Sequence, residues 1–390
     1  MTRRIRTRSI VGGGLVVVAV AAFVLARAGE TTTARAAGNA DWATIAATAR
    51  GQTVKLWMWG GEDALNRYVD DDVVPRAAAA GVHLERVPID DTATALARIA
   101  AERDAGRTTR GAVDLLWVNG KNFAQGKAAG LWLTGWADRV PNTKYLDPSD
   151  PTTRYDFGVA TDSQELAWSR AAFVFASDSA KVSEPPKDFD ALAAYVRAHP
   201  GRFTYPAPPD FTGSAFVRQA VQALGEDKAF TYLQQLQPYL WQQGKQYPKD
   251  EPELERLFAD GQVDLAMSYN PNFVDTGVAR GAFAGTVRPY VFTTGTLQNV
   301  SFLAIPSNAS SPEGAQVVAD LFLSPALQAA KLAKVGIPTV LDLDLLGVDA
   351  ALFATSGSPH RLDRFGTPLE ELPADRVPIL DRRWRNEVLR

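Results

Sequence analysis

The chain has 390 residues, of which 46% are hydrophobic and 22% are charged, and its formal net charge is −3. This hydrophobic share excludes a mainly disordered protein, the length suits about two or three domains, and the charge gives no sign of nucleic-acid binding. The absence of cysteine excludes disulfides, cysteine nucleophiles, cysteine-type zinc sites and lipid attached to a cysteine, and three histidines fit poorly with a histidine-rich metal site or a histidine-based catalytic triad.

The N-terminal residues 1–28 differ in composition from the rest of the chain. They hold five arginines and no acid, and removing these from the 41 basic residues leaves 36 against 44 acidic ones. Residues 10–26 are uncharged, and Ala26-Arg27-Ala28 matches a signal-peptidase site. The run is near the lower limit of a membrane span, so residues 1–28 are predicted to be either a cleaved signal peptide or a signal anchor. Residues 29–44 are predicted to be a linker, and the remainder is expected outside the cytoplasm.

Beyond the linker, the chain alternates predicted strands and helices. Strands are expected at 54–59, 82–87 and 113–118, with helices at 62–79 and 90–105 between them. The strands carry Val, Leu or Trp on both faces, as in a parallel sheet covered by helices. This order predicts an α/β fold.

A second block of the same kind follows, and no repeat of 20 to 50 residues suggests a solenoid. No later apolar run is long enough for another membrane span. Strands are predicted at 172–176, 203–205, 263–268, 287–292 and 299–305, and helices at 188–198, 214–224, 251–260, 312–323 and 325–335.

Several predicted strands end in residues that are suited to ligand contact. Ligands of open α/β sheets bind beyond the carboxyl ends of strands. Glycine allows close approach, asparagine offers donors and an acceptor, and tryptophan offers a flat ring. Alternatively, the tryptophans are core residues and the others form turns. The candidates are Trp59, Gly60, Gly61 and Glu62; Trp117, Asn119, Gly120 and Asn122; and Tyr269 and Asn270.

A short polar segment opens the helix predicted at 214–224. It contains Asp210, Thr212, Gly213 and Ser214. These residues can cap the helix. They can also form a helix N-terminus that faces an anionic or polar part of a ligand.

Glu165 and Trp168 lie between the two blocks. A carboxylate beside an indole suits a cationic or aromatic ligand, because the carboxylate supplies a charge partner and the ring a cation–π surface. The alternative is an exposed glutamate beside a packed tryptophan.

No sequence motif indicates catalysis. The chain lacks GxSxG, HExxH, Walker and strand-linked GxGxxG motifs, and the run Asp70-Asp71-Asp72 fits a solvated helix face. We therefore predict no catalytic residues, no metal site and no cofactor. Two alternatives stay open: a secreted glycan hydrolase with a dispersed carboxylate pair, and a ligand sensor or scaffold without a transport role.

Several segments resemble one family. Residues 311–328, which include Leu321-Phe322-Leu323-Ser324-Pro325, resemble extracellular solute-binding proteins of ABC importers. Trp59-Gly60-Gly61, Pro185-Pro186 and the segments 114–123 and 201–216 are more specifically similar to YnjB-type solute-binding proteins. The likeness spans about residues 50 to 345, and the 201–216 block is its most specific part.

The resemblance implies a type 2 periplasmic-binding-protein fold with a ligand cleft between two α/β lobes. Lobe 1 is expected at 45–160 plus 295–340, lobe 2 at 165–290, and a C-terminal tail packing on the lobes at 341–390. Lys121 departs from the glutamate of the family pattern and Ser169 from its glycine. At the first of these positions the chain therefore carries a positive charge where the family pattern has a negative one.

The resulting hypothesis is a monomeric binding protein that closes on a small organic solute and delivers it to an ABC transporter permease. It would be periplasmic or tethered to the outer face of the cytoplasmic membrane. The aromatic candidates favour a thiamine-like or quaternary ammonium cation over sulfate or iron. In this hypothesis Trp59, Trp117 and Trp168 stack on the solute, Glu165 balances its charge, Thr212, Gly213 and Ser214 hold a polar or anionic part, and Asn119, Tyr269 and Asn270 form hydrogen bonds.

Overall fold

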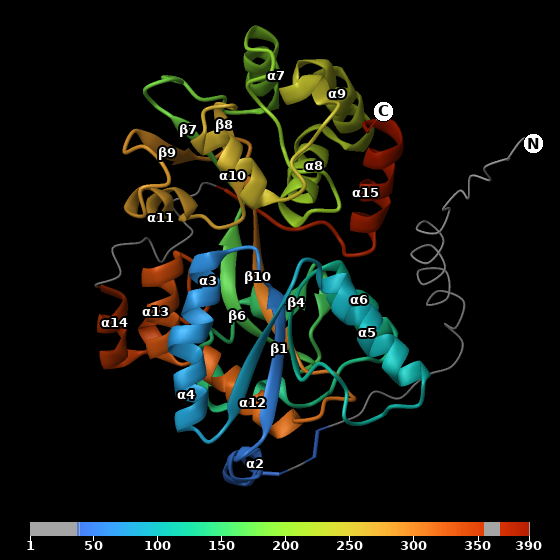
Figure 1. Cartoon of the computed structure of the whole chain (residues 1–390), viewed down its shortest axis with the longest axis vertical. Coiled ribbons are helices and arrows are strands. Elements are labelled where there is room, and N and C mark those ends of the chain that lie inside the picture. The colour runs from blue at the N-terminus through green and yellow to red at the C-terminus, as the bar shows by residue number, and fades with distance from the viewer. Residues whose placement is uncertain (1–36, 39, 355–366, 390) are drawn as a thin grey trace, which may run out of the picture.

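The computed structural model describes residues 37–38, 40–354 and 367–389, so the predicted signal and most of the predicted linker lie outside it. The chain forms two α/β lobes, one above the other, with long strands running between them (Figure 1). We call the part built on the larger sheet lobe 1 and the part built on the smaller sheet lobe 2. Within the described residues, no helix has the length and apolarity to cross a membrane.

Lobe 1 is built on a six-stranded mixed sheet in which β1, β2 and β3 are parallel. Strand β10 runs antiparallel to β3 and to β6, and β11 adds to β10 in parallel. The carboxyl ends of the first three strands therefore share one edge, as the strand-end prediction requires. The strands are β1 (Thr53–Trp59), β2 (His83–Ile89), β3 (Leu115–Val118), β6 (Glu165–Ala172), β10 (Thr296–Ala304) and β11 (Pro368–Leu369).

Helices cover both faces of this sheet. One face packs on side chains such as Tyr68, Phe322 and Leu332, and the other packs on Ile99 and Phe123. A π turn at Val69–Val73 interrupts the helix predicted at 62–79. The first face carries α2 (Trp42–Ala49), α3 (Asp63–Tyr68), α4 (Val74–Ala79), α12 (Pro312–Phe322) and α13 (Pro325–Val335), with α14 (Ala351–Ala354) beside α13, and the second carries α5 (Thr92–Asp104) and α6 (Lys121–Ala128).

Lobe 2 is built on a three-stranded sheet of order β8-β7-β9, which is antiparallel rather than parallel as the sequence predicted. Its core is strongly aromatic: Phe175 stacks on Phe292 at 4.4 Å between ring centroids. The strand predicted at 203–205 is instead a buried coil. The elements are β7 (Val174–Asp178), β8 (Leu265–Ser268), β9 (Val287–Tyr290), α7 (Phe189–Ala198), α8 (Phe211–Leu224), α9 (Glu226–Leu236), α10 (Glu251–Ala259), α11 (Phe273–Ala279) and α15 (Arg376–Glu387).

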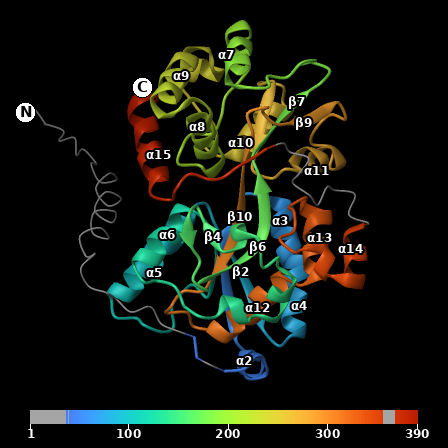
Figure 2. The same cartoon turned by 180° about the vertical axis from the view of Figure 1, so that it is seen from behind.

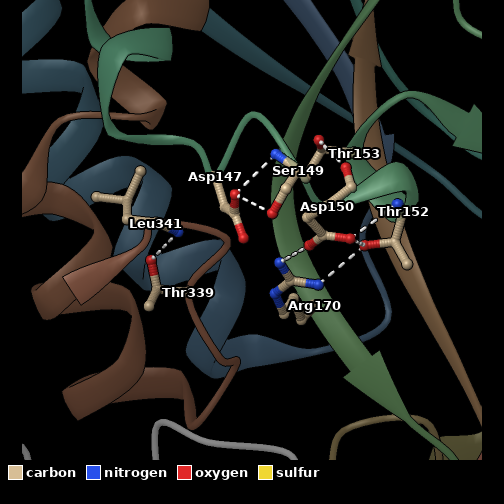
Figure 3. A network of polar contacts seen from close by, with 8 residues as sticks. All are labelled: Asp147, Ser149, Asp150, Thr152, Thr153, Arg170, Thr339 and Leu341. Carbon is tan, nitrogen blue, oxygen red and sulfur yellow. Dashed lines mark hydrogen bonds and ion pairs between the residues drawn. The ribbon is translucent and has the colours of Figure 1, made fainter. Parts of the chain in front are cut away.

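The antiparallel strands β6 and β10 carry the chain between the lobes. Arg170 anchors β6 to lobe 1, because its guanidinium pairs with Asp150 and donates to Thr152 Oγ1 at 3.0 Å (Figure 3). The same segment of lobe 1 contains a small hairpin of β4 (Tyr155–Asp156) and β5 (Val159–Ala160). The hairpin turn brings Phe157 towards lobe 2, where its ring lies 6.4 Å from that of Phe211.

A third connection between the lobes is the C-terminal strap, residues 367–389. It starts as β11, passes between the lobes, and ends as α15 beside α8 (Figure 2). On the lobe 1 side, the Ala374 N–H donates to Phe157 O at 3.1 Å. On the lobe 2 side, fully buried Trp384 donates to Tyr205 Oη at 2.9 Å. The strap therefore contacts both lobes.

Candidate functional site

The end of β1 places Trp59 and Glu62 at the edge of lobe 1 that faces lobe 2. Trp59 is half-buried, and its ring lies directly against Gly61. A Cβ atom at Gly61 would lie 2.3 Å from the Trp59 ring, and one at Gly60 would lie 2.6 Å from Pro88. Gly61 therefore leaves room for this position of the indole, and Gly60 allows the close approach of Pro88 from β2.

Glu62 precedes α3 and faces carboxyl groups of lobe 2. Burial, and then the nearby charge of Glu251, raise the pKa of Glu62 to about 7. Glu251 begins α10, and burial raises its pKa although it accepts hydrogen bonds from Ser268 and Thr212. One turn later, burial and then the charges of Glu251 and Glu62 raise the pKa of Glu255 well above its usual range. Carboxyl groups of both lobes therefore lie close enough to repel one another.

Asp210 completes this group, which we call the inter-lobe acid cluster: Glu62, Asp210, Glu251 and Glu255. Asp210 caps α8 by accepting from Gly213 N at 2.9 Å, yet burial raises its pKa to about 7. The positive charge of Arg280 lowers the pKa of Glu62 and of Glu255, but within the described residues no ion pair reaches any member of the cluster. Among these residues, no group of three or more His, Cys, Asp or Glu side chains is arranged to hold a metal ion.

The loop after β3 covers a second pair of carboxyl groups, inside lobe 1. Gly120 N donates to Asp156 Oδ2 at 2.6 Å. Glu165 is 3% exposed, and neither of its oxygens has a hydrogen-bond partner among the described residues. Burial and then the Asp156 charge raise its pKa well above the usual range. Glu165 thus lies in the interior of lobe 1, near the loop that carries half-buried Asn119 and buried Asn122.

The structure places Trp168 in the core of lobe 1. It is 1% exposed, and its ring packs against Trp117 and Phe322, each at 5.3 Å between centroids. Its carbonyl oxygen accepts hydrogen bonds from Lys331 Nζ at 2.8 Å and Gln328 Nε2 at 2.7 Å. Because stacking on a solute requires a free ring face, we assign Trp168 to the core. Trp117 is half-buried and packs on the same cluster.

The polar groups at the start of α8 are already bonded to carboxylates of the chain. Thr212 Oγ1 donates to Glu251, Gly213 N donates to Asp210, and Ser214 Oγ donates to Asp381 Oδ1 at 2.6 Å. The role predicted for Thr212, Gly213 and Ser214, holding a polar or anionic part of the solute, therefore does not fit this arrangement.

Tyr269 and Asn270 follow β8 at the lobe 2 edge. The Tyr269 hydroxyl donates to Glu371, and its ring lies 5.1 Å from Phe211. Asn270 Nδ2 donates to Val335 O of lobe 1 at 3.0 Å, so this side chain fastens the two lobes together. In this structure both predicted hydrogen-bonding side chains bond within the chain.

Comparison with known proteins identifies the family. The family model described as bacterial extracellular solute-binding protein matches residues 73–342. The chain is also 38% identical over 322 residues to Protein YnjB of Escherichia coli (strain K12), which covers 77% of this chain and 83% of that protein. The chain belongs to the bacterial extracellular solute-binding protein family. The resemblance inferred from the sequence is confirmed.

Solved structures confirm the type 2 periplasmic-binding fold of this solute-binding protein. One similar structure is the fructose-6-phosphate-bound binding protein AfuA of Actinobacillus pleuropneumoniae, with a TM-score of 0.66 and 17% identity over 87% of this chain and 99% of that one. Another is a periplasmic thiamin binding protein, with a TM-score of 0.65 and 18% identity over 87% of this chain and 96% of that one. Apo ferric ion-binding protein A of Pasteurella haemolytica is also similar, with a TM-score of 0.65 and 14% identity over 86% of this chain and 97% of that one. Family and fold are those of exported binding proteins rather than enzymes, and support a ligand-binding role for an ABC importer.

Sequence reasoning missed several residues of this solute-binding protein that lie between the lobes. Asp250-Glu251-Pro252 reads as an ordinary helix start, with an N-cap and an acid in the first turn, and does not point to a ligand. The Pro, Arg and Asp residues of the strap show no clear period, so the sequence predicts no helix or strand there. The missed residues are Phe157, Phe211, Arg218, Glu251, Glu255, Glu371 and Asp381.

Proposed function

We propose that this solute-binding protein captures a small organic cation between its lobes and presents it to an ABC transporter permease, without a catalytic step. The observation that carries the proposal is the inter-lobe acid cluster, to which both lobes contribute and for which the described residues supply no ion pair. Carboxylates withdrawn from water are costly without a counter-charge. A bound cation would provide that charge.

The position of the cluster also connects binding with closure. Glu62 belongs to lobe 1 and Glu251 to lobe 2. The charge of Glu62 raises the pKa of Glu255, and the charge of Glu251 raises the pKa values of Glu62, Asp210 and Glu255. Like charges on opposing lobes resist approach, whereas a cation between them attracts both. A cationic solute would therefore favour the closed arrangement through its differential affinity for that state.

Aromatic rings near the cluster support an organic rather than a bare metal cation. Trp59 lies three residues before Glu62, and Phe211, 37% exposed, follows Asp210 directly. Such rings attract cations through their negative faces. Thiamine-like compounds and quaternary or primary amines are the ligand classes that we propose.

The proposed place of action is the periplasm or the outer face of the cytoplasmic membrane. These 390 residues contain no cysteine, and we propose that the apolar segment predicted at residues 10–26 supplies the tether to the membrane. We propose that the protein works as a monomer.

A binding screen tests the proposal. Native mass spectrometry of the purified protein identifies any retained solute, and calorimetry then compares thiamine, choline and putrescine with sulfate and phosphate. We expect binding of at least one cation and of neither anion. Glu62→Gln and Glu251→Gln should each lower the affinity for the cation by about tenfold or more, which corresponds to the loss of one charge-assisted contact. Exposed Glu184→Gln is the matched control and should bind normally. Binding of the anions alone would reject the proposal.

A further inference from the structure

Arg218, in the second turn of α8, forms a buried ion pair with a carboxylate of the C-terminal strap. Its guanidinium donates from Nε and Nη2 to the two oxygens of Glu371, at 2.7 and 2.9 Å, and the two side chains are only 1% and 3% exposed. Nη1 donates to Ser214 Oγ at 2.8 Å. The guanidinium also lies 5.4 Å from the ring centres of Phe157, from lobe 1, and Phe211, from lobe 2. Arg218 is thus held at the junction of the lobes.

A second carboxylate of the strap lies beside the first. Asp381 Oδ1 accepts from Ser214 Oγ at 2.6 Å, and Oδ2 accepts from Lys121 Nζ of lobe 1 at 3.1 Å. The Tyr269 hydroxyl donates to Glu371. Two cations, one from each lobe, therefore face two carboxylates that both belong to the C-terminal strap. We call Lys121, Ser214, Arg218 and Tyr269 the strap-anion site.

The donors of the strap-anion site are those with which proteins hold carboxylates and phosphates. An arginine fork binds two oxygens of one anion, and hydroxyl groups near a helix N-terminus add further donors. In this chain, the bonds from Thr212, Gly213 and Ser214 end on the protein's own carboxylates, and so do the two bonds from Nε and Nη2 of Arg218. An anionic solute would have to displace a buried, bidentate ion pair to use them.

We propose that Glu371 and Asp381 determine specificity: they occupy an anion site between the lobes as internal substitutes for an anionic ligand and so exclude anionic solutes. This inference rests on the proposed function and narrows the choice of solute. With the strap-anion site occupied by the chain itself, the inter-lobe acid cluster is the part between the lobes that a solute would contact. It also explains the lysine at position 121, which supplies the lobe 1 partner of Asp381.

The test is to empty the site and refill it with a free anion. Glu371→Ala removes the carboxylate and leaves the arginine fork buried without a partner, so the variant should melt at a lower temperature than the wild type. Acetate or inorganic phosphate should raise that melting temperature in proportion to the logarithm of its concentration, whereas chloride at equal ionic strength should not. Calorimetry should detect one anion site in the variant and none in the wild type. Glu370→Ala, at the exposed neighbouring position, is the matched control.

Asp381→Ala provides a second variant, because it frees Lys121 and Ser214 in the same site. If either variant is recovered only as unfolded chain, the readout becomes refolding: acetate should restore folded protein and chloride should not. Variants that fold but bind neither acetate nor phosphate, or unfolded variants that acetate does not restore, overturn the inference. If the wild type still binds a cation in that case, the proposed function stands alone. Phosphate binding by the wild type, without any cation binding, overturns both.

Discussion

Glu62 and Glu251 show what residue types at strand ends can and cannot reveal. The strand-end rule placed Glu62 next to Trp59 at the edge facing lobe 2, where the structure has it. Its partner Glu251 comes from a helix start 189 positions later, and no local signal connects the two. Trp168 lies in the core of lobe 1. Because the sequence predicts no strand at β6, the face on which this ring lies does not follow from the sequence.

The raised pKa values predict how binding depends on pH. Glu62 has a pKa of about 7 instead of 4.5, so it is protonated below pH 7 and loses the charge that attracts a cation. We expect the affinity for the cationic solute to fall by up to about tenfold per pH unit below 7, measured by calorimetry between pH 5.5 and 8. Glu62→Gln should make this profile shallower, and the remaining slope would come from Asp210, whose pKa is also about 7. An affinity that does not change over this range would contradict the assignment.

The stability of the solute-free protein should change in the opposite sense. The folded chain binds an extra proton at Glu62 between the ordinary pKa of 4.5 and about 7, and Asp210, with a pKa of about 7, acts in the same direction. The free energy of unfolding should therefore decrease as the pH rises to 7. Above pH 7 these two groups should lower it no further. Urea unfolding at intervals between pH 5 and 8 measures this. Saturating solute should remove much of the decrease.

Two tryptophans offer a matched pair that separates binding from packing. Trp168→Ala should lower the free energy of unfolding by about 3–5 kcal/mol, because the ring is buried against Trp117 and Phe322, and should leave the affinity of the folded protein nearly unchanged. Trp59→Ala should lower the free energy of unfolding by less than Trp168→Ala does, and it should lower the affinity for the cation by about tenfold. Urea unfolding measures the stability of both variants, and calorimetry measures their affinity for the cation. If Trp168→Ala lost affinity and Trp59→Ala did not, Trp168 would belong to the ligand site.

At the scale of elements, sequence periodicity located the regular parts of both lobes and failed where long-range pairing decides. Helices α12 and α13 match their predicted ranges closely, because both begin with a proline that fits the first turn. Strand β6 was missed: its residues Ser169 and Arg170 read as polar, and it exists because it pairs with β10. The strap elements β11 and α15 escape prediction for the same reason, because they gain stability only by packing on elements that are distant in the sequence.

Helix α8 provides a prediction at this scale, because its start is pressed against the preceding coil. A Cβ atom at Gly213 would lie 1.9 Å from Pro206 O, so Gly213→Ala must displace either the helix or the backbone of residues 203–207. We expect a loss of about 3 kcal/mol in urea unfolding, as for severe overpacking. Gly285→Ala, where no atom lies within 4 Å of the added Cβ, should change the free energy of unfolding by little. Equal behaviour of the two variants would show that α8 tolerates a shift.

At the scale of the molecule, three kinds of contact between the lobes act on closure with different signs. Asn270 with Val335, and Lys121 with Asp381, hold the lobes together through contacts within the chain. The inter-lobe acid cluster opposes closure through the charges of Glu62, Glu251 and Glu255. A cation that neutralises the cluster therefore removes the opposing contribution and leaves the fastening contacts in place.

Closure should consequently respond to protons in the same way as to solute. Because the chain has no cysteine, Arg67→Cys on α3 and Arg256→Cys on α10, both exposed, would be its only labelling sites, one on each lobe. Spin-label distance measurements at pH 8 should give a longer distance without solute than with it. Lowering the pH to 5.5 without solute should populate the shorter distance, since the cluster loses its charge. Adding Glu62→Gln and Glu251→Gln to the labelled protein should shorten the distance already at pH 8. If the distance shortened with solute but ignored both pH and these substitutions, closure would not depend on the acid cluster.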